Sequence, residues 1–331
     1  MRQLVSELRK NVITLWAMLA VSLIKILKPK IQLTYDNRNP IDGTGAQLQR
    51  ILGIYCLSKF LNLDYVHKEI KDVSTHALDP FQDDYSRKEF VVRVNKIFDL
   101  DSSATAHPNS VFVSKLQIRG FLKEALRNRV TQKPVLLNII EPFGIIDYLP
   151  RIYEEVPVID FGFDKSVTSK FGQIAIHYRH GVGGFVKYHK QTISRQLQDS
   201  YYLDCIKLLK PEVNRGEKIL LFTDAPVAAL DFVPPPNQVR NWIGSPNFDG
   251  KKIKISKSEV DSIFLDSGLN IEYIHGGDPL EALAIMANAR ILIIGRSSFS
   301  YVGGLLNKYG KVVYPRSFWH SPLRGWKRIN G

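Results

Sequence analysis

The sequence has few of the residues that build metal centres or disulfide frameworks. Only two cysteines occur, Cys56 and Cys205, and neither belongs to a CxxC motif or a cysteine/histidine cluster. Their scarcity excludes a disulfide framework and a structural zinc site of the usual spacing. It leaves the redox compartment undecided and is consistent with a reducing one. P-loop, GxSxG and complete GxGxxG motifs are also missing, which removes the common signatures of NTP hydrolysis, serine hydrolysis and dinucleotide binding.

Acidic residues are scarce at the two ends of the chain. The 331 residues include 45 lysines and arginines against 32 aspartates and glutamates, a net charge of +13. Residues 1–30 hold six basic groups and one acidic group, residues 311–331 hold five basic groups and no acidic one, and the 280 residues between them carry only +3. A groove for a nucleic-acid backbone would spread basic groups over the body of the protein. The distribution therefore argues against nucleic acid as a partner.

Long apolar runs are also lacking. The most apolar stretch, from Asn11 to Ile24, has 14 uncharged residues, fewer than the roughly 18 to 20 that cross a bilayer. Apolar residues around it recur every three or four positions, as on one face of a helix: Leu4, Leu8, Val12, Trp16, Leu19, Leu23 and Leu27.

This pattern predicts that residues 1–30 form an amphipathic helix whose basic ends bind an anionic membrane surface. The expected location is then cytoplasmic and peripheral to a membrane. A terminal helix packed on the globular body explains the same pattern equally well. A type II signal anchor, which would make the chain a type II membrane protein, is a third interpretation.

From Ile31 onward, short apolar runs alternate with segments of helical period, and 44% of the chain is hydrophobic, enough for full cores. Strands are predicted at 31–35, 63–67, 135–140, 173–179, 218–222, 271–275, 291–294 and 312–314, and helices at 46–61, 90–98, 114–130, 193–210, 279–289 and 298–308. This alternation indicates an α/β protein with two parallel sheets. We expect an amino-terminal helix at 1–30, a first domain at 31–165 and a second at 166–331.

Doubly wound sheets bind ligands beyond the carboxyl ends of their strands. Gly43 and Gly45 follow the first strand and precede a helix, where glycines permit close backbone approach and the helix offers free N–H groups to an anion. Ser297 and Ser298 follow the apolar strand that ends at Gly295, where the next helix begins. Their hydroxyls and the helix N–H groups suit a phosphate, although serine is also an ordinary N-cap.

A third strand end carries a histidine and an arginine. Alternation along a strand puts His177 and Arg179 on the same face, just before a loop with Gly181, Gly183 and Gly184. The guanidinium presents a fork of donors that suits two phosphate oxygens. Its charge would persist as a leaving pyrophosphate gains negative charge. The sequence therefore predicts a phosphate or nucleotide site at this edge.

Together these stretches resemble the alpha-1,2-fucosyltransferase family and its wider superfamily, which includes alpha-1,6- and protein O-fucosyltransferases. The run DGTGAQLQRILGIYCLSKFL is similar to the family's opening loop and helix, and His177, Arg179 and Gly181 match its HxRxG motif. LFTDAP, with Thr223 and Asp224, and DPLEALAIMANARILIIGRSSFSYVGGLLN are similar to its later signatures. The order and spacing agree over about residues 31–310.

The resemblance implies a GT-B fold of two facing Rossmann-like domains, with the nucleotide sugar held by the second domain and a glycan acceptor in the cleft. It implies inverting transfer of fucose from GDP-fucose to a glycan hydroxyl, with no cofactor and no obligatory metal. Arg179 would contact the donor pyrophosphate and assist its departure, with His177 beside it. The other positions carried over as binding residues are Gly43, Gly45, Gln47, Gly181, Asp224, Asp278, Ser297, Ser298 and Phe299.

The chain also departs from the family pattern. Val182 stands where an acidic residue often follows the motif, Ala46 and Gln47 replace the usual Asn-Gln, and Arg296 replaces a common Asn. These changes leave open a transferase for another nucleotide sugar and a non-catalytic member that binds a glycan or a nucleotide. Inversion asks for a base near the acceptor hydroxyl, and the candidates are Asp42, Glu141 and Asp147.

Overall fold

The computed structural model contains two parallel sheets. It describes residues 2–38, 43–73, 84–178, 185–188, 191–194, 197, 199–214, 216–223, 231–232, 253–254, 268–274 and 278–330. The first sheet has the order β2-β1-β4-β3 and is parallel throughout. Its strands are β1 (Ile31–Tyr35), β2 (Asp64–Tyr65), β3 (Ser110–Lys115) and β4 (Val135–Glu141).

The second sheet has the order β11-β8-β5-β12-β13-β14, again with parallel neighbours. Its strands are β5 (Ile174–Tyr178), β8 (Lys218–Thr223), β11 (Asn270–Ile274), β12 (Ile291–Ile293), β13 (Lys311–Pro315) and β14 (Lys327–Ile329). Two short antiparallel pairs are separate: β6 (Phe185–Tyr188) with β7 (Gln191–Ser194), and β9 (Asp231–Phe232) with β10 (Ile253–Lys254).

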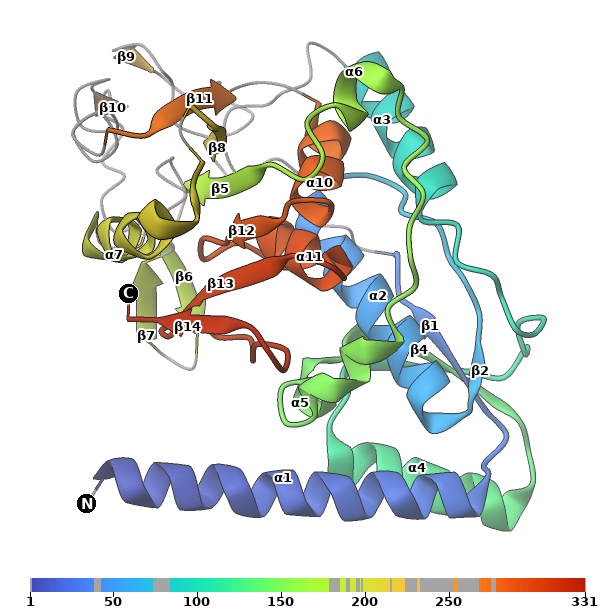
Figure 1. Cartoon of the computed structure of the whole chain (residues 1–331). Helices are drawn as coiled ribbons and strands as arrows, with labels where there is room; N and C mark the ends of the chain where they lie inside the picture. The colour runs from blue at the N-terminus through green and yellow to red at the C-terminus, as the bar shows by residue number, and fades with distance from the viewer. Residues whose placement is uncertain are drawn as a thin grey trace.

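Helices cover and connect the sheets (Figure 1). They are α1 (Arg2–Leu27), α2 (Thr44–Leu61), α3 (Asp84–Ile97), α4 (Ile118–Thr131), α5 (Phe143–Ile146), α6 (Lys165–Thr168), α7 (Asp199–Leu209), α10 (Pro279–Ala287) and α11 (Ser298–Leu306), with 3-10 turns η1 (Pro150–Glu155) and η2 (Lys210–Glu212). The predicted α/β class with two parallel sheets and an amino-terminal helix is confirmed. The predicted division between residues 165 and 166 stays a prediction.

The two faces of the second sheet pack on different helices. Ile174, Ile176 and Tyr178 of β5 join a buried cluster with α7, whereas Ala175 belongs to the large cluster that includes α10 and α11. Side chains therefore alternate along β5 as a strand requires. This alternation puts His177 on the same side of the sheet as α11.

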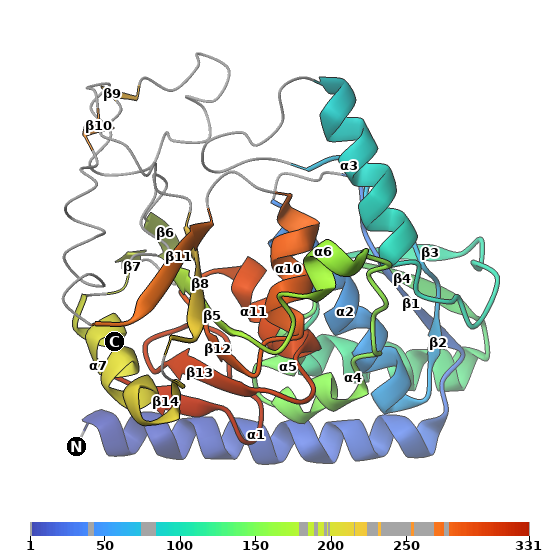
Figure 2. The same cartoon turned by 45° about the horizontal axis from the view of Figure 1, so that its top comes forward.

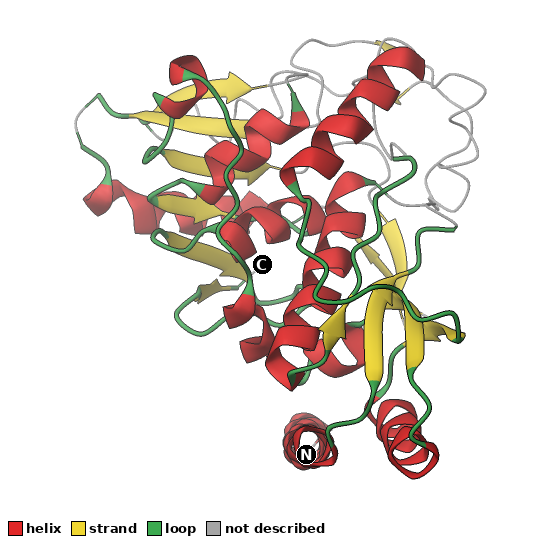
Figure 3. Ribbon diagram, turned by 90° about the vertical axis from the view of Figure 1, so that its right-hand side faces the viewer, coloured by secondary structure: helices red, strands yellow, loops and turns green. Residues whose placement is uncertain are grey.

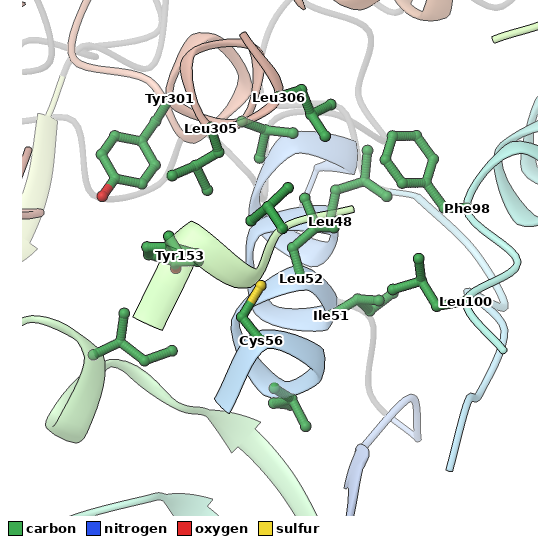
Figure 4. Packing of buried hydrophobic residues seen from close by; sticks show 14 of the residues in the cluster. Leu48, Ile51, Leu52, Cys56, Phe98, Leu100, Tyr153, Tyr301, Leu305 and Leu306 are labelled. Carbon is green, nitrogen blue, oxygen red and sulfur yellow. The ribbon is translucent and has the colours of Figure 1, made fainter. Parts of the chain in front are cut away.

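Helix α2 lies between the two sheets, in contact with α11, η1 and β1. Figure 4 shows its side chains Leu48, Leu52 and Cys56 close to Tyr301, Leu305 and Leu306 of α11 and to Tyr153 of η1. Even its polar residues Gln47, Gln49 and Ser58 are buried. A helix buried on nearly every side belongs to the interior of the molecule, so α2 serves as a shared core element for both sheets.

Helix α1 packs on the body through a different face from the one that its sequence periodicity indicates. Ala17, Ala20, Val21 and Ile24 are buried. The predicted stripe is exposed at Val12, Trp16, Leu19 and Leu23, with Leu19 at 64%. Among the described residues, none of the helices combines the length and apolar character that crossing a bilayer requires.

Four predicted elements differ from the structure. The helix expected over 90–98 begins earlier, at Asp84, and ends at Ile97. The helix expected over 114–130 begins only at Ile118, because residues 110–115 form the edge strand β3. The helix expected over 193–210 begins at Asp199, after strand β7. The strand expected over 63–67 pairs only at Asp64 and Tyr65.

Candidate functional site

The carboxyl ends of β5 and β12 lie side by side in the second sheet, with Ile176 opposite Ile293. His177, the penultimate residue of β5, is buried at 7% exposure. Just beyond β12, a Cβ atom on Gly295 would lie 2.9 Å from the His177 carbonyl oxygen and 3.2 Å from its Nδ1. Position 295 therefore needs a glycine for the two strand ends to approach this closely.

Two tyrosines of α7 form hydrogen bonds to the backbone at these strand ends. The Tyr201 hydroxyl donates to the Ile294 carbonyl oxygen at 2.9 Å, and the Tyr202 hydroxyl donates to the His177 carbonyl oxygen at 3.4 Å. Burial raises the pKa of Tyr201 well above its ordinary value, so it stays a neutral donor. The backbone around His177 is thereby fixed by buried hydrogen bonds.

Helix α11 begins directly at this edge. The Ser297 Oγ atom accepts the Phe299 N–H at 3.3 Å as the N-cap, and the buried Ser300 hydroxyl donates to the Gly295 carbonyl at 3.4 Å. The Phe299 ring lies 6.3 Å from the His177 ring, tilted by 47°. The structure thus places Ser297, Phe299 and His177 at one edge of the sheet, with Ser298 as the first residue of the helix. Their roles in donor binding stay predictions.

The amino terminus of α2 meets the amino terminus of α11. Gly43 is the N-cap of α2 and has no side chain to cap it. A Cβ atom on Gly45 would lie 2.4 Å from Phe299 Cα and 2.5 Å from its backbone nitrogen. Each helix terminus carries N–H groups without intrahelical partners and a partial positive charge. Two such termini in contact make this region attractive to an anion.

Gln47 lies one turn into α2 and is fully buried. Its Oε1 atom accepts the Tyr35 hydroxyl at 3.4 Å, and its Nε2 atom donates to the Asp72 carbonyl at 2.7 Å. These contacts tie α2 to the end of β1 and to the segment after β2. A role facing the sugar stays a prediction for this residue.

Asp278 lies at the start of α10, where its carboxylate accepts the Leu280 N–H at 2.9 Å as the N-cap. The other carboxylate oxygen pairs with Arg93 of α3. This contact links α10, a helix between strands β11 and β12 of the second sheet, to α3, a helix between strands β2 and β3 of the first. Arg179, Gly181 and Asp224 lie outside the described residues.

Of the three candidate bases, Asp42 lies outside the described residues. Glu141 ends β4 opposite Lys115 on the edge strand. Asp147 pairs with the nearly buried His320 at 3.3 Å, next to the turn that joins β13 and β14. A base role for these three residues stays a prediction.

Arg296 is a cation at this edge that the sequence reasoning treated only as a departure from a pattern. It sits between Gly295 and Ser297, is half-buried, and donates to the Ser317 hydroxyl. Burial lowers its pKa, yet a guanidinium remains charged in proteins. Its position between the end of a predicted strand and the start of a predicted helix was the sequence feature that could have identified it as a candidate site residue.

The sequence matches no protein-family model and no curated protein. Among solved structures, the chain is similar to POFUT1 in complex with GDP, with a TM-score of 0.42 and 11% identity over 84% of this chain and 94% of that one. The structure of POFUT1 in complex with GDP-fucose has a TM-score of 0.42 and 10% identity, over 91% of this chain and 98% of that one. The E. coli heptosyltransferase WaaC with ADP-2-deoxy-2-fluoro heptose has a TM-score of 0.34 and 9% identity, over 90% of this chain and 92% of that one. Likenesses this weak do not establish an activity for this chain.

Proposed function

We propose that the chain is a nucleotide-sugar-dependent glycosyltransferase of the GT-B kind. The observation that carries the proposal is the meeting of the α2 and α11 amino termini at Gly45 and Phe299, beside His177 at the end of β5. Paired helix termini at the carboxyl edge of a parallel sheet are suited to a diphosphate. The order of motifs that resembles fucosyltransferases supports the same assignment.

The finer proposal is an inverting transfer of fucose from GDP-fucose to a glycan hydroxyl. The acceptor oxygen attacks the anomeric carbon, the bond from that carbon to the diphosphate oxygen breaks, and GDP leaves with the electron pair. The hydroxyl proton passes to a base or to water. Arg179 is proposed to stabilise the charge on the departing diphosphate, with the α11 terminus and the Ser298 hydroxyl as further donors.

Nucleotide binding tests the donor class. GDP should stabilise the purified protein against heat more than UDP or CMP does. At a hundredfold excess over its Kd, GDP should add about 2.7 kcal/mol to the free energy of unfolding of the ligand-free protein. Equal stabilisation by all three would remove the reason to prefer a guanine nucleotide and would favour another sugar donor. Binding of GDP-fucose without turnover on any glycan would favour a non-catalytic member.

Substitution of the proposed leaving-group contact tests the chemistry. Arg179→Ala should abolish transfer while the melting temperature stays that of the unchanged protein. The matched control, Lys207→Ala, removes an exposed cation of α7 that pairs with Asp204 of the same helix, and it should leave transfer unchanged. Full activity in the Arg179 variant would contradict the proposed mechanism.

A further inference from the structure

Helix α1 turns an apolar face away from the protein. Its outward positions recur every three or four residues, and their exposed fractions include 59% at Leu15, 64% at Leu19 and 75% at Ile26. The same face includes Val12, Trp16 and Leu23. The helix has 26 residues, about 39 Å at the usual rise per residue. The exposed apolar positions run from Val12 to Ile26, about 21 Å of that length. A continuous apolar strip of this kind is rare on a free surface and marks a contact with another phase or molecule.

Helix α4 adds a second outward face that is basic as well as apolar. It buries Phe121, Ala125 and Asn128. The opposite positions on the helix are exposed, and they combine cationic and apolar side chains at helical spacing: Arg119, Lys123, Leu126, Arg127 and Val130. Val130 is 84% exposed.

The two helices are fixed to each other at one side of the molecule. The Asn128 amide of α4 accepts the Lys30 N–H just after α1 and donates to the Lys30 carbonyl oxygen at 3.3 Å. Figure 3, which views α1 and α4 nearly along their axes, shows them next to each other below the sheets. Figure 1 shows α1 running beneath the width of the molecule. The outward positions of both helices can therefore contact one flat surface together.

We propose that α1 and α4 form a single docking surface for an anionic lipid bilayer. By sequence, residues 2–30 carry six basic groups and one acidic group, and residues 118–133 carry five and one, for net charges of +5 and +4. A second copy of the chain would bring equal positive charges together, which disfavours a dimer through this surface. Anionic lipid headgroups attract these basic side chains instead, and the apolar strip of α1 enters the boundary between the headgroups and the acyl chains. The inference is independent of the proposed transfer reaction.

Vesicle flotation of the full chain tests the surface without any activity measurement. The protein should bind vesicles of phosphatidylcholine with phosphatidylserine much more strongly than phosphatidylcholine alone, and added salt should weaken the binding. Lys123→Gln with Arg127→Gln should lower the partition coefficient about twenty- to thirtyfold, since each cation near the surface is worth about fivefold. Leu15→Gln with Leu19→Gln should lower it about tenfold or more.

The matched control is Lys88→Gln with Lys96→Gln, which removes two exposed cations from α3 at the end of the molecule opposite α1 (Figure 2). This control should bind vesicles like the unchanged protein. Deletion of residues 1–30 is a poorer test, because it would also take Ala17, Val21 and Ile24 out of the core.

Equal binding to both vesicle types, or unchanged binding by the α4 variant, would overturn the proposal. Circular dichroism and melting curves of each variant show whether it has folded. A dimer in light scattering that is lost in the Leu15/Leu19 variant, together with no vesicle binding, would assign the surface to a second copy of the chain.

Discussion

The contact between α2 and α11 makes Gly45→Ala a sharp test of the proposed site. The added methyl group would lie 2.4 Å from Phe299 Cα and 2.5 Å from its backbone nitrogen. These are backbone atoms, so a side-chain rotation cannot relieve the overlap. The start of α11 is further held by the Ser297 cap and by the bond from Ser300 to Gly295. The two helix termini must therefore move apart.

Two opposing contributions set the magnitude of the stability change. Alanine in place of glycine within a helix gains about 1 kcal/mol, whereas overpacking a closed contact costs about 1 to 3 kcal/mol, and more where backbone must shift. We expect a net loss of up to about 2 kcal/mol in the free energy of unfolding. Affinity for GDP should fall as well, because the donors of the two termini no longer converge.

Gly120→Ala is the matched control, because a Cβ atom there has no neighbour within 4 Å. This variant should be stabilised by up to about 1 kcal/mol and should bind GDP normally. Urea denaturation gives the stability difference, and calorimetric titration gives the GDP affinity. If Gly45→Ala were as stable as Gly120→Ala and bound GDP as the unchanged protein does, the close approach of α2 and α11 would not position the site.

Two further predictions concern groups outside this contact. The buried Asp36 carboxylate accepts a hydrogen bond from Arg38, and that bond lowers the pKa of Asp36. The bond therefore stabilises the folded state at pH values above the pKa that Asp36 has in the unfolded chain. This stabilisation is lost as pH falls below about 4. Asp36→Asn should lower the free energy of unfolding near neutral pH by about 1 kcal/mol and should make this free energy fall less steeply in acid. Urea denaturation at several pH values measures both effects, and an acid dependence equal to that of the unchanged protein would contradict the prediction. Burial raises the pKa of Cys205 to about 12 and also raises the pKa of Cys56. Iodoacetamide near pH 8 should therefore label neither thiol in the native protein and both in urea. Mass spectrometry reads out the labelling, and rapid native modification of either cysteine would refute its assigned burial.

The periodicity of the sequence predicted the parallel strands and the helix α2 well, because buried elements have strong apolar patterns. Strand β3 is the exception, because the sequence predicts a helix over 114–130 that takes in its last two residues and predicts no element over 110–113. Strand β3 lies at the sheet edge, and Ser110, Val111, Phe112, Ser114 and Lys115 are all exposed. No alternation of buried and exposed side chains marks such a strand. Its pairing with β4 depends on contacts that lie outside its own segment.

The site was predictable only where chain order places residues at strand ends. His177, Gly295 and Ser297 follow from the positions of β5 and β12, since the carboxyl ends of parallel strands share one edge. The contact between Gly45 and Phe299 joins residues far apart in the sequence, and no local pattern encodes it. The outward face of α4 was missed for another reason. Residues 118–133, which include α4, carry +4, but the 280 central residues that contain them total only +3, because the rest of that region is slightly acidic.

The position of α2 between the two sheets has a consequence for synthesis of the chain. The side of α2 that meets α11 finds its partner about 250 residues later, which at ribosomal speed takes roughly 10 to 50 seconds. During that interval Leu48 and Leu52 have no α11 to cover them. The nascent first half thus presents an apolar surface, and this surface is a natural substrate for chaperones that act on the ribosome.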